Sequence, residues 1–142
     1  MEPKILIPVD DSLTAQATIN YVIAQRIRFP RSLSLMYVIN QEQLAYRMIP
    51  DFQLDMVKEN SQKSGQKLLE KYRSQLSEVC FSCDLILETG EPRKIITNIA
   101  NDQAFDLLVI GRHEGGGEIR DVLFGSVANY VLHNVRCPVL LV

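Results

Sequence analysis

Residues 105–126 read FDLLVIGRHEGGGEIRDVLFGS, and this stretch decides the fold. Its first six residues are apolar except for Asp106, a pattern typical of a strand that helices bury on both faces. Five of the chain's seven glycines follow within residues 111–125. A buried strand that runs directly into a glycine-rich loop indicates an α/β protein that holds a ligand at its strand ends.

Apolar periodicity in the rest of the chain predicts strands that alternate with helices. The expected strands are residues 4–9, 32–39, 79–88, 105–110 and 138–142. The expected helices are residues 13–27, 54–76, 92–100 and 122–134, with Gly65 weakening the middle of the second. Residues 40–52 lack a clean period and predict a long connection. The pattern predicts one α/β domain over residues 1–142, an open, doubly wound, Rossmann-like parallel sheet flanked by helices. We expect strand order 3-2-1-4-5, in which the first and fourth strands are central neighbours and their outgoing loops face each other.

Composition and charge exclude several classes of protein. The chain has 142 residues, of which 46% are hydrophobic and 23% charged, as in a packed globular domain. Its net charge of −2 lacks the basic excess that binding along a nucleic-acid backbone requires. Residues 1–8 are too short an apolar run for a signal peptide, and no stretch approaches the roughly 18 apolar residues of a membrane span. We therefore expect a cytoplasmic protein with neither nucleic acid nor membrane as a partner.

The three cysteines, an odd number, favour reduced thiols over a disulfide framework. Cys80 and Cys83 have the spacing of a redox motif, but they lead into a strand instead of opening a helix. A zinc site would need two more ligands, and Cys137, His113 and His133 are scattered without ligand spacing. We interpret the cysteine pair as structural.

The glycine-rich loop has the residues of a phosphate-binding loop. Glycines let several backbone amides approach one phosphate with no Cβ in the way. Gly125 and Ser126 stand near the start of the last expected helix, whose free amides and dipole favour an anion. The P-loop motif G-x-x-x-x-G-K-[ST] is absent, and so is the fingerprint G-x-G-x-x-G after the first strand. Composition alone leaves a phosphate cradle and a flexible surface loop as equal alternatives.

Three separated segments together resemble the universal stress protein family. They are Pro8-Val9-Asp10-x-Ser12 after the first strand, Gly111 with Gly115-x9-Gly125-Ser126 after the fourth, and the final Cys137-Pro138-Val139-Leu140-Leu141-Val142. The resemblance covers the whole chain in length, element order and both loops. It implies an ATP-binding protein associated with survival under stress, and not an enzyme with a dedicated metabolic reaction.

The resemblance also implies a set of ligand contacts. Nucleotide-binding members carry G-x2-G-x9-G-[ST] around the ATP phosphates, while the aspartate after the first strand and the backbone at the end of the second hold ribose and adenine. The residues carried over by position are Gly111, Gly115, Gly125 and Ser126 at the phosphates, Asp10 near the ribose and Val38 beside the adenine, with Pro8 adjoining and the amides of Val9, Arg112 and Val127 contributing. Because acidic side chains outnumber basic ones in residues 111–125, Mg²⁺ would offset their repulsion of the phosphates.

The glycine spacing leaves two functions open. This chain has three residues, not two, between Gly111 and Gly115. A bulge in the glycine-rich loop could absorb the extra residue, or the residue could spoil the cradle. The alternative function is that of a nucleotide-free family member, a protein-interaction module that uses residues 40–52. A flavodoxin-like carrier is disfavoured because residues 8–13 do not form a hydroxyl-rich phosphate loop.

Neither catalysis nor a monomeric state is expected. The acidic residues and His113 around the two loops form no recognisable catalytic arrangement, so we assign no catalytic residue and expect slow hydrolysis at most. The apolar run 138–142 would form an exposed sheet edge, which invites pairing with a second copy. The resemblance implies the same homodimer, paired through the last strands.

Overall fold

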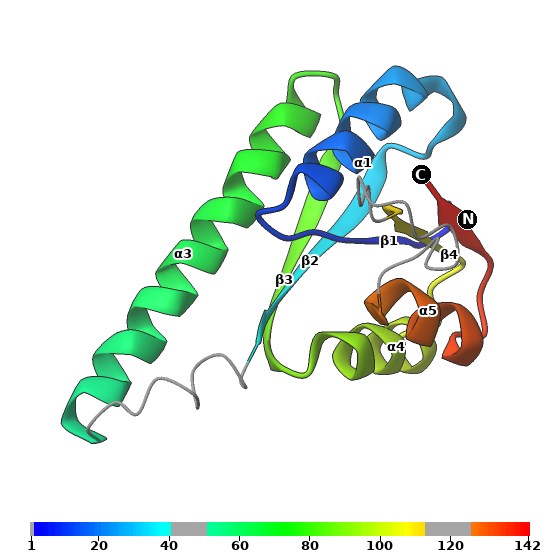
Figure 1. Ribbon diagram of the computed structural model, residues 1–142. Coiled ribbons are helices and arrows are strands. Elements are labelled where there is room, and N and C mark those ends of the chain that lie inside the picture. The colour runs from blue at the N-terminus through cyan, green and yellow to red at the C-terminus, as the bar shows by residue number, and fades with distance from the viewer. Residues whose placement is uncertain (1, 41–50, 113–125) are drawn as a thin grey trace, which may run out of the picture.

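The computed structural model describes residues 2–40, 51–112 and 126–142 of the chain (Figure 1). Its elements in chain order are β1 (Ile5–Pro8), α1 (Leu13–Ala24), the 3₁₀ turn η1 (Arg26–Arg28), β2 (Ser32–Asn40), α3 (Asp51–Ser77), β3 (Ser82–Gly90), α4 (Pro92–Asp102), β4 (Leu107–Ile110), α5 (Ser126–Asn134) and β5 (Val139–Leu141). Strands and helices alternate as the sequence predicts. The expected connection at residues 41–50 and the predicted helical residues 122–125 lie outside the described residues.

The strands form one sheet in the order β3-β2-β1-β4-β5, and all of its pairings are parallel. The predicted strand order and the doubly wound α/β fold are therefore confirmed. β1 pairs with β2 only as far as Pro8↔Met36, whereas β2 pairs with β3 up to Asn40↔Gly90. The β2–β3 half of the sheet thus extends beyond the end of β1.

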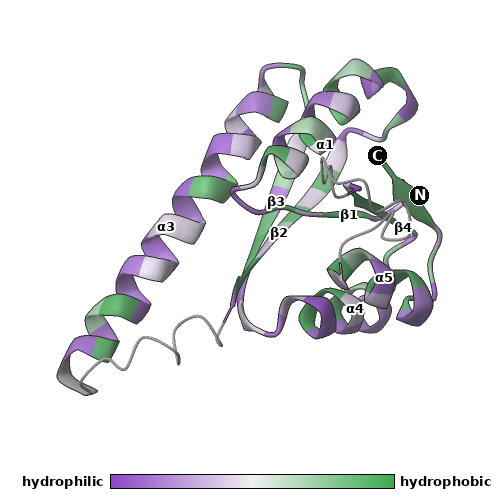
Figure 2. Cartoon of the chain, viewed as in Figure 1, coloured by the Kyte–Doolittle hydropathy of each residue, from purple (hydrophilic) through white to green (hydrophobic). Residues whose placement is uncertain are grey.

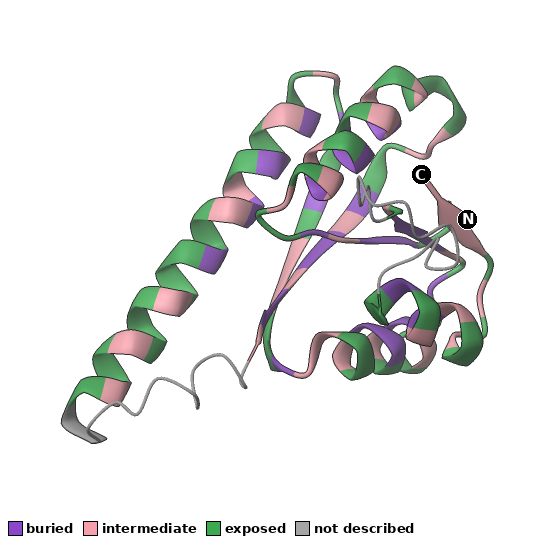
Figure 3. Ribbon diagram, in the orientation of Figure 1, coloured by how far each residue is buried: buried purple, intermediate pink, exposed green. Residues whose placement is uncertain are grey.

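Each face of the sheet is covered by a pair of helices. α1 and α3 pack on one face, where their side chains meet Ile5 and Ile7 of β1. α4 and α5 pack on the other face, which receives Leu6 of the same strand. This alternation follows from the two-residue period of a strand, and Figures 2 and 3 show apolar, buried positions along the strands and on the sheet-facing sides of the helices. The connections that leave β1 and β4 therefore run to opposite faces.

Helix α3 begins earlier than predicted and packs closely on the sheet. It spans 27 residues from Asp51, a length of about 40 Å, and its first turns extend past the sheet (Figure 1). A Cβ atom on Gly65 would lie 2.8 Å from both Tyr37 Cδ1 and Leu87 Cδ1. Gly65 is therefore also a close contact point between α3 and strands β2 and β3, a role that its low helix propensity does not reveal.

The predicted strand 79–88 starts too early because helix α3 ends in a Schellman turn. The backbone N–H of Phe81 donates to the carbonyl oxygen of Leu76 at 3.1 Å, and that of Cys80 donates to Ser77 at 3.0 Å. Cys80 takes the left-handed position of this turn with φ 71°. Residues 79–81 thus end the helix, and β3 begins at Ser82.

Helix α4 ends in the same way, which shortens the predicted strand 105–110. Phe105 N–H donates to Ala100 at 3.1 Å and Ala104 N–H donates to Asn101 at 3.2 Å, with Ala104 at φ 52°. β4 consequently begins at Leu107. The first helix is also shorter than predicted, since α1 ends at Ala24 and the remaining turn is η1.

Candidate functional site

The centre of the sheet forms a topological switch point. β1 and β4 pair side by side, with Ile5 opposite Leu107 and Leu6 opposite Leu108, and their connections leave to opposite faces. In open α/β sheets ligands bind in the crevice beyond the carboxyl ends of two such strands. The structure therefore brings together two segments that the sequence singled out, residues 8–12 and residues 111–112. Gly115 and Gly125 lie outside the described residues.

The loop after β1 is held by its own hydrogen bonds. Val9 is buried, and its N–H donates to the carbonyl oxygen of Met36 at 2.7 Å. Asp10 is exposed, and its Oδ1 accepts from the backbone N–H of Ser12 at 2.9 Å and from the Ser12 hydroxyl. Ser12 Oγ in turn accepts from Ala15 N–H at 3.2 Å and caps α1. The carboxylate of Asp10 is thereby fixed at the mouth of the crevice.

Tyr72 supports this loop from within the core. The hydroxyl of Tyr72, on α3, donates to the backbone oxygen of Asp10 at 3.4 Å. Burial raises the pKa of Tyr72 and of Tyr37, and the negative charges of Asp10 and Asp11 raise both pKa values further. Both phenols therefore remain neutral donors. Sequence reasoning missed the contact because Tyr72 matches the apolar stripe of its helix and its partner is 62 positions away.

Gly111, directly after β4, is required by helix packing. A Cβ atom there would lie 2.4 Å from Thr14 Cγ2 and 2.5 Å from Thr18 Oγ1. Thr18 is buried and its hydroxyl donates to the Thr14 carbonyl at 2.9 Å, which fixes the threonine against the strand end. The fold thus needs glycine at this position whether or not a ligand binds.

Two of the amides expected at the phosphates already have partners in the sheet. Arg112 N–H donates to the carbonyl of Val142 at 2.9 Å, and Val142 N–H donates to Ile110 at 2.9 Å, so the β4–β5 pairing continues past both strands. The N–H of Val9 is used by Met36. The N–H groups of Val9 and Arg112 are therefore already used within the sheet, and any contact of these residues with a ligand must involve their other atoms.

Val38 presents a polar backbone edge to the crevice. Backbone groups of a strand point alternately to its two neighbours. The Met36 carbonyl points toward β1, where it accepts from Val9, so the N–H and C=O of Val38 point to the same side. β1 has ended there, while the side chain of Val38 is buried among α4 and neighbouring strands. The backbone of Val38 therefore faces the space beyond β1.

Ser126 and Val127 open α5 at the same end of the sheet. Both are exposed. The first N–H groups of a helix have no partner within the helix, and its dipole places partial positive charge at that end. The start of α5 therefore has the electrostatic character that an anionic group requires.

The cysteines lie away from this crevice. Cys83 lies near the start of β3, and burial raises the pKa of its thiol to about 11, so the thiol stays protonated at neutral pH. Cys80 is exposed in the turn that ends α3. A hollow of about 550 Å³ between α3 and β3 is lined by Glu70, Arg73, Ser74, Ser77, Phe81, Ser82 and Cys83. These features agree with a structural interpretation of the cysteine pair.

Within the described ranges, no group of three or more His, Cys, Asp or Glu side chains is placed to hold a metal ion. No helix in the same part of the chain is long and apolar enough to span a membrane.

Known proteins share both the sequence pattern and the fold. The sequence model of the Universal stress protein family matches residues 1–142. The chain is 29% identical to Universal stress protein Sll1388 of Synechocystis over 149 residues, 98% of this chain and 96% of that protein. It is 26% identical to Universal stress protein MJ0577 of Methanocaldococcus jannaschii over 156 residues, 100% of this chain and 95% of that protein. The solved structure of MJ0577 gives a TM-score of 0.82 at 27% identity, covering 100% of this chain and 96% of that one.

Two further solved structures contain adenine nucleotides. One is a universal stress protein family protein from Arabidopsis thaliana with AMP bound, with a TM-score of 0.70, 17% identity and coverage of 99% of this chain and 90% of that one. The other is a universal stress protein in complex with cAMP, with a TM-score of 0.66, 16% identity and coverage of 99% and 96%. At these identities the likeness is one of fold.

Proposed function

The chain belongs to the universal stress protein family, and on this premise we propose that it binds an adenine nucleotide, ATP with Mg²⁺, in the crevice between β1 and β4. It acts as a homodimeric cytoplasmic protein of the stress response, with slow or no hydrolysis. The observation that carries the proposal is the early end of β1, which leaves the Val38 backbone facing the space beyond that strand, at the end from which the loop with the fixed carboxylate of Asp10 departs.

The adenine ring fits the exposed backbone edge of β2. Adenine carries a ring nitrogen that accepts a hydrogen bond next to an amino group that donates one. Val38 offers an N–H and a C=O on one side of the strand, the complementary pair. Adenine recognition by backbone leaves the side chain of Val38 in the core, where the structure has it.

The ribose and phosphates take the other two parts of the crevice. The Asp10 carboxylate accepts hydrogen bonds from ribose hydroxyls, and charged acceptors make the stronger bonds. The phosphates lie over Gly111 and the start of α5 at Ser126 and Val127, with Gly115 and Gly125 completing the loop. The AMP and cAMP named in the two relatives support an adenine nucleotide as the ligand class.

Analysis of the purified protein tests the proposal most directly. The protein is denatured, any released nucleotide is identified, and the emptied protein is titrated with ATP and Mg²⁺ by calorimetry. No released nucleotide and no heat at millimolar ATP would overturn the proposal. A Gly125→Asp variant should lose ATP binding and keep its fold, because it places a carboxylate at the phosphates.

A matched pair of variants tests the ribose contact. Asp10→Asn keeps an oxygen that can accept from Ser12 but loses the charge, so the affinity for ATP should fall about fivefold, the difference between a charged and a neutral acceptor. Asp11→Asn removes the same charge one residue away and should change affinity less than Asp10→Asn. Equal effects of the two would show that only overall charge matters.

A second candidate function is that of a nucleotide-free family member that acts through protein partners. The three residues between Gly111 and Gly115 favour it, and so does the use of the Arg112 amide by Val142. The calorimetric titration described above distinguishes the two functions, because the second candidate function requires that the emptied protein bind no adenine nucleotide.

The homodimer uses the outer edge of β5. The N–H and C=O of Val142 point toward β4, so by alternation those of Leu141 point away from the sheet. β5 pairs only with β4 among the described strands, and its residues are half-buried. An apolar edge of this kind invites pairing with a second copy, and this supports the proposed dimer.

A further inference from the structure

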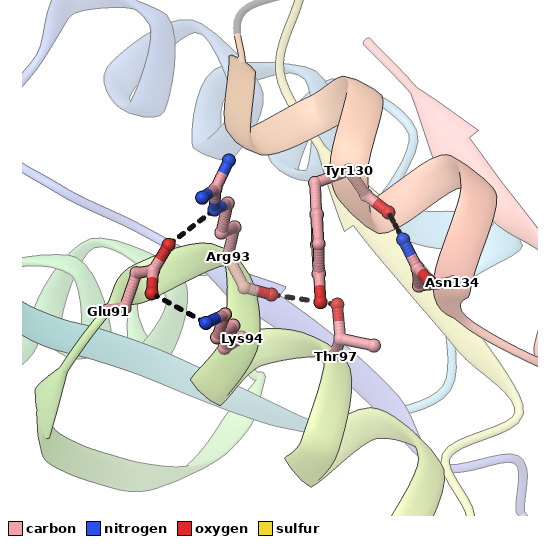
Figure 4. A network of polar contacts seen from close by, with 6 residues as sticks. All are labelled: Glu91, Arg93, Lys94, Thr97, Tyr130 and Asn134. Atoms are coloured by element: carbon pink, nitrogen blue, oxygen red, sulfur yellow. Dashed lines mark hydrogen bonds and ion pairs between the residues drawn. The ribbon is translucent and has the colours of Figure 1, made fainter.

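Arg93 lies in the first turn of α4, outside both loops of the proposed nucleotide site. Its guanidinium carbon is 5.2 Å from the centroid of the Tyr130 ring on α5. Arg93 Nε donates to Glu91 Oε1 at 2.5 Å, and Lys94 Nζ lies 3.2 Å from Glu91 Oε2 (Figure 4). The arginine is therefore held between the carboxylate of the residue that caps its own helix and a ring on the neighbouring helix.

Arg93 packs against α5 through the ring of Tyr130. Tyr130 and Ser126 are four residues apart, so both lie on the same face of the helix. The ring itself extends from α5 toward α4, with its hydroxyl end near Thr97. Figure 4 shows the guanidinium beside this ring, on the side from which α5 starts.

We propose that Arg93 is a further binding residue of this site, that it contacts the phosphate chain, and that it favours a nucleoside triphosphate over a monophosphate. The inference rests on the nucleotide binding proposed above. Residues 111–125 carry two arginines against three acidic residues, so the loop itself has no surplus of positive charge to hold a polyphosphate. Arg93 supplies a cation from a different element, on the Ser126 face of α5.

The existing contacts of Arg93 leave it able to bind a phosphate. A guanidinium has five N–H donors in a planar fork, and the bond to Glu91 uses Nε. The hydrogen bonds from Arg93 and then Lys94 lower the pKa of Glu91, which keeps that carboxylate ionised at neutral pH. Glu91 thus holds the arginine in position before the ligand arrives, which reduces the entropy lost on binding.

The test compares ligands that differ only in phosphate number. Arg93→Gln should weaken ATP binding about tenfold, the loss of one hydrogen bond to a charged group, and should change AMP and adenosine binding less than about twofold. Lys94→Gln is the matched control, because Lys94 shares Glu91 but does not stack on Tyr130. It should leave all three affinities within about twofold.

The ring gives a second and independent readout. Tyr130→Leu should lower the affinity for ATP and leave that for adenosine unchanged, whereas Tyr130→Phe keeps the ring and should bind ATP as the unchanged protein does. Thermal unfolding of each variant verifies that the fold is retained.

Three outcomes overturn the inference. If the Arg93→Gln variant binds ATP normally, Arg93 does not contact the phosphates, and the proposed nucleotide binding itself is unaffected. Equal losses for ATP, AMP and adenosine show a purely structural arginine. If the protein without substitutions binds no nucleotide, both this inference and the proposed function are wrong.

Discussion

The hydroxyl oxygen of Thr18 lies where it would be 2.5 Å from a Cβ atom on Gly111, so α1 packs against the end of β4 with no space for a side chain. A Gly111→Ala substitution should therefore lower the free energy of unfolding by about 1–3 kcal/mol, the usual cost of overpacking a core. Urea denaturation measures the change. Because the contact is with helix α1, the loss should appear in the absence of any nucleotide.

A second substitution separates this clash from other effects of alanine. Thr14→Ser removes the Cγ2 atom that would lie 2.4 Å from the new Cβ, so it should recover part of the stability in the Gly111→Ala background. Thr14→Ser alone serves as the control. If Gly111→Ala unfolds at the same urea concentration as the unchanged protein, the packing explanation is wrong.

Ala104→Gly should stabilise the protein. Ala104 ends α4 in a left-handed conformation with φ 52°, which costs an L-residue about 1 kcal/mol and glycine almost nothing. The free energy of unfolding should accordingly rise by up to that amount, as measured by thermal or urea denaturation. Gln103→Gly, at φ −93°, is the matched control and should give no gain. A stabilisation by both variants would point to a cause other than the turn.

Stability should decrease at alkaline pH partly because of Cys83. Burial raises the pKa of this thiol from 9.0 to about 11, so the unfolded chain loses the proton first. The stabilisation that the protonated thiol provides is complete below pH 9 and is lost as the pH rises to 11. Cys83→Ala should flatten the slope of unfolding free energy against pH in this range. A slope will remain, because burial also raises the pKa values of Tyr37 and Tyr72.

Leu141→Pro should convert the proposed dimer into monomers. Proline removes the N–H of Leu141, which points away from the sheet, and leaves the bonds between Val142 and β4 in place. Leu141→Ala keeps the N–H and should remain dimeric. Sedimentation over a range of protein concentrations distinguishes the two. A monomeric unchanged protein, or a dimeric Leu141→Pro, would rule out pairing through β5.

Much of the fold could be predicted from local patterns. The doubly wound parallel sheet followed from the alternation of strands and helices. The crevice followed once the first and fourth strands were taken as central neighbours, because ligand loops in such sheets come from the strands where the order reverses. Element ends were less predictable. Cys80 and Ala104 adopt left-handed turns that glycine usually occupies, so the sequence lacked the residue that normally marks a helix end.

The contacts that shape the site depend on residues far apart in sequence. Nothing near Tyr72 indicates that its hydroxyl reaches the backbone of Asp10, and nothing near Arg93 indicates that it stacks on Tyr130. Gly111 illustrates the opposite difficulty, since a glycine that matches a phosphate motif also has a packing role that the motif does not reveal. Such double roles become visible only when the helix that covers the strand end is in place.

The two hydrogen bonds of Val142 connect the end of the last strand to the start of the glycine-rich loop. They join Val142 to Ile110, which precedes Gly111, and to Arg112, which follows it. The end of the last strand is therefore hydrogen-bonded to both residues that flank Gly111, where the glycine loop begins. A strand added to the outer edge of β5 would hold these two hydrogen bonds more rigidly in place. Assembly and loop geometry would then be thermodynamically linked, and tighter association would be matched by an equal change in ligand affinity.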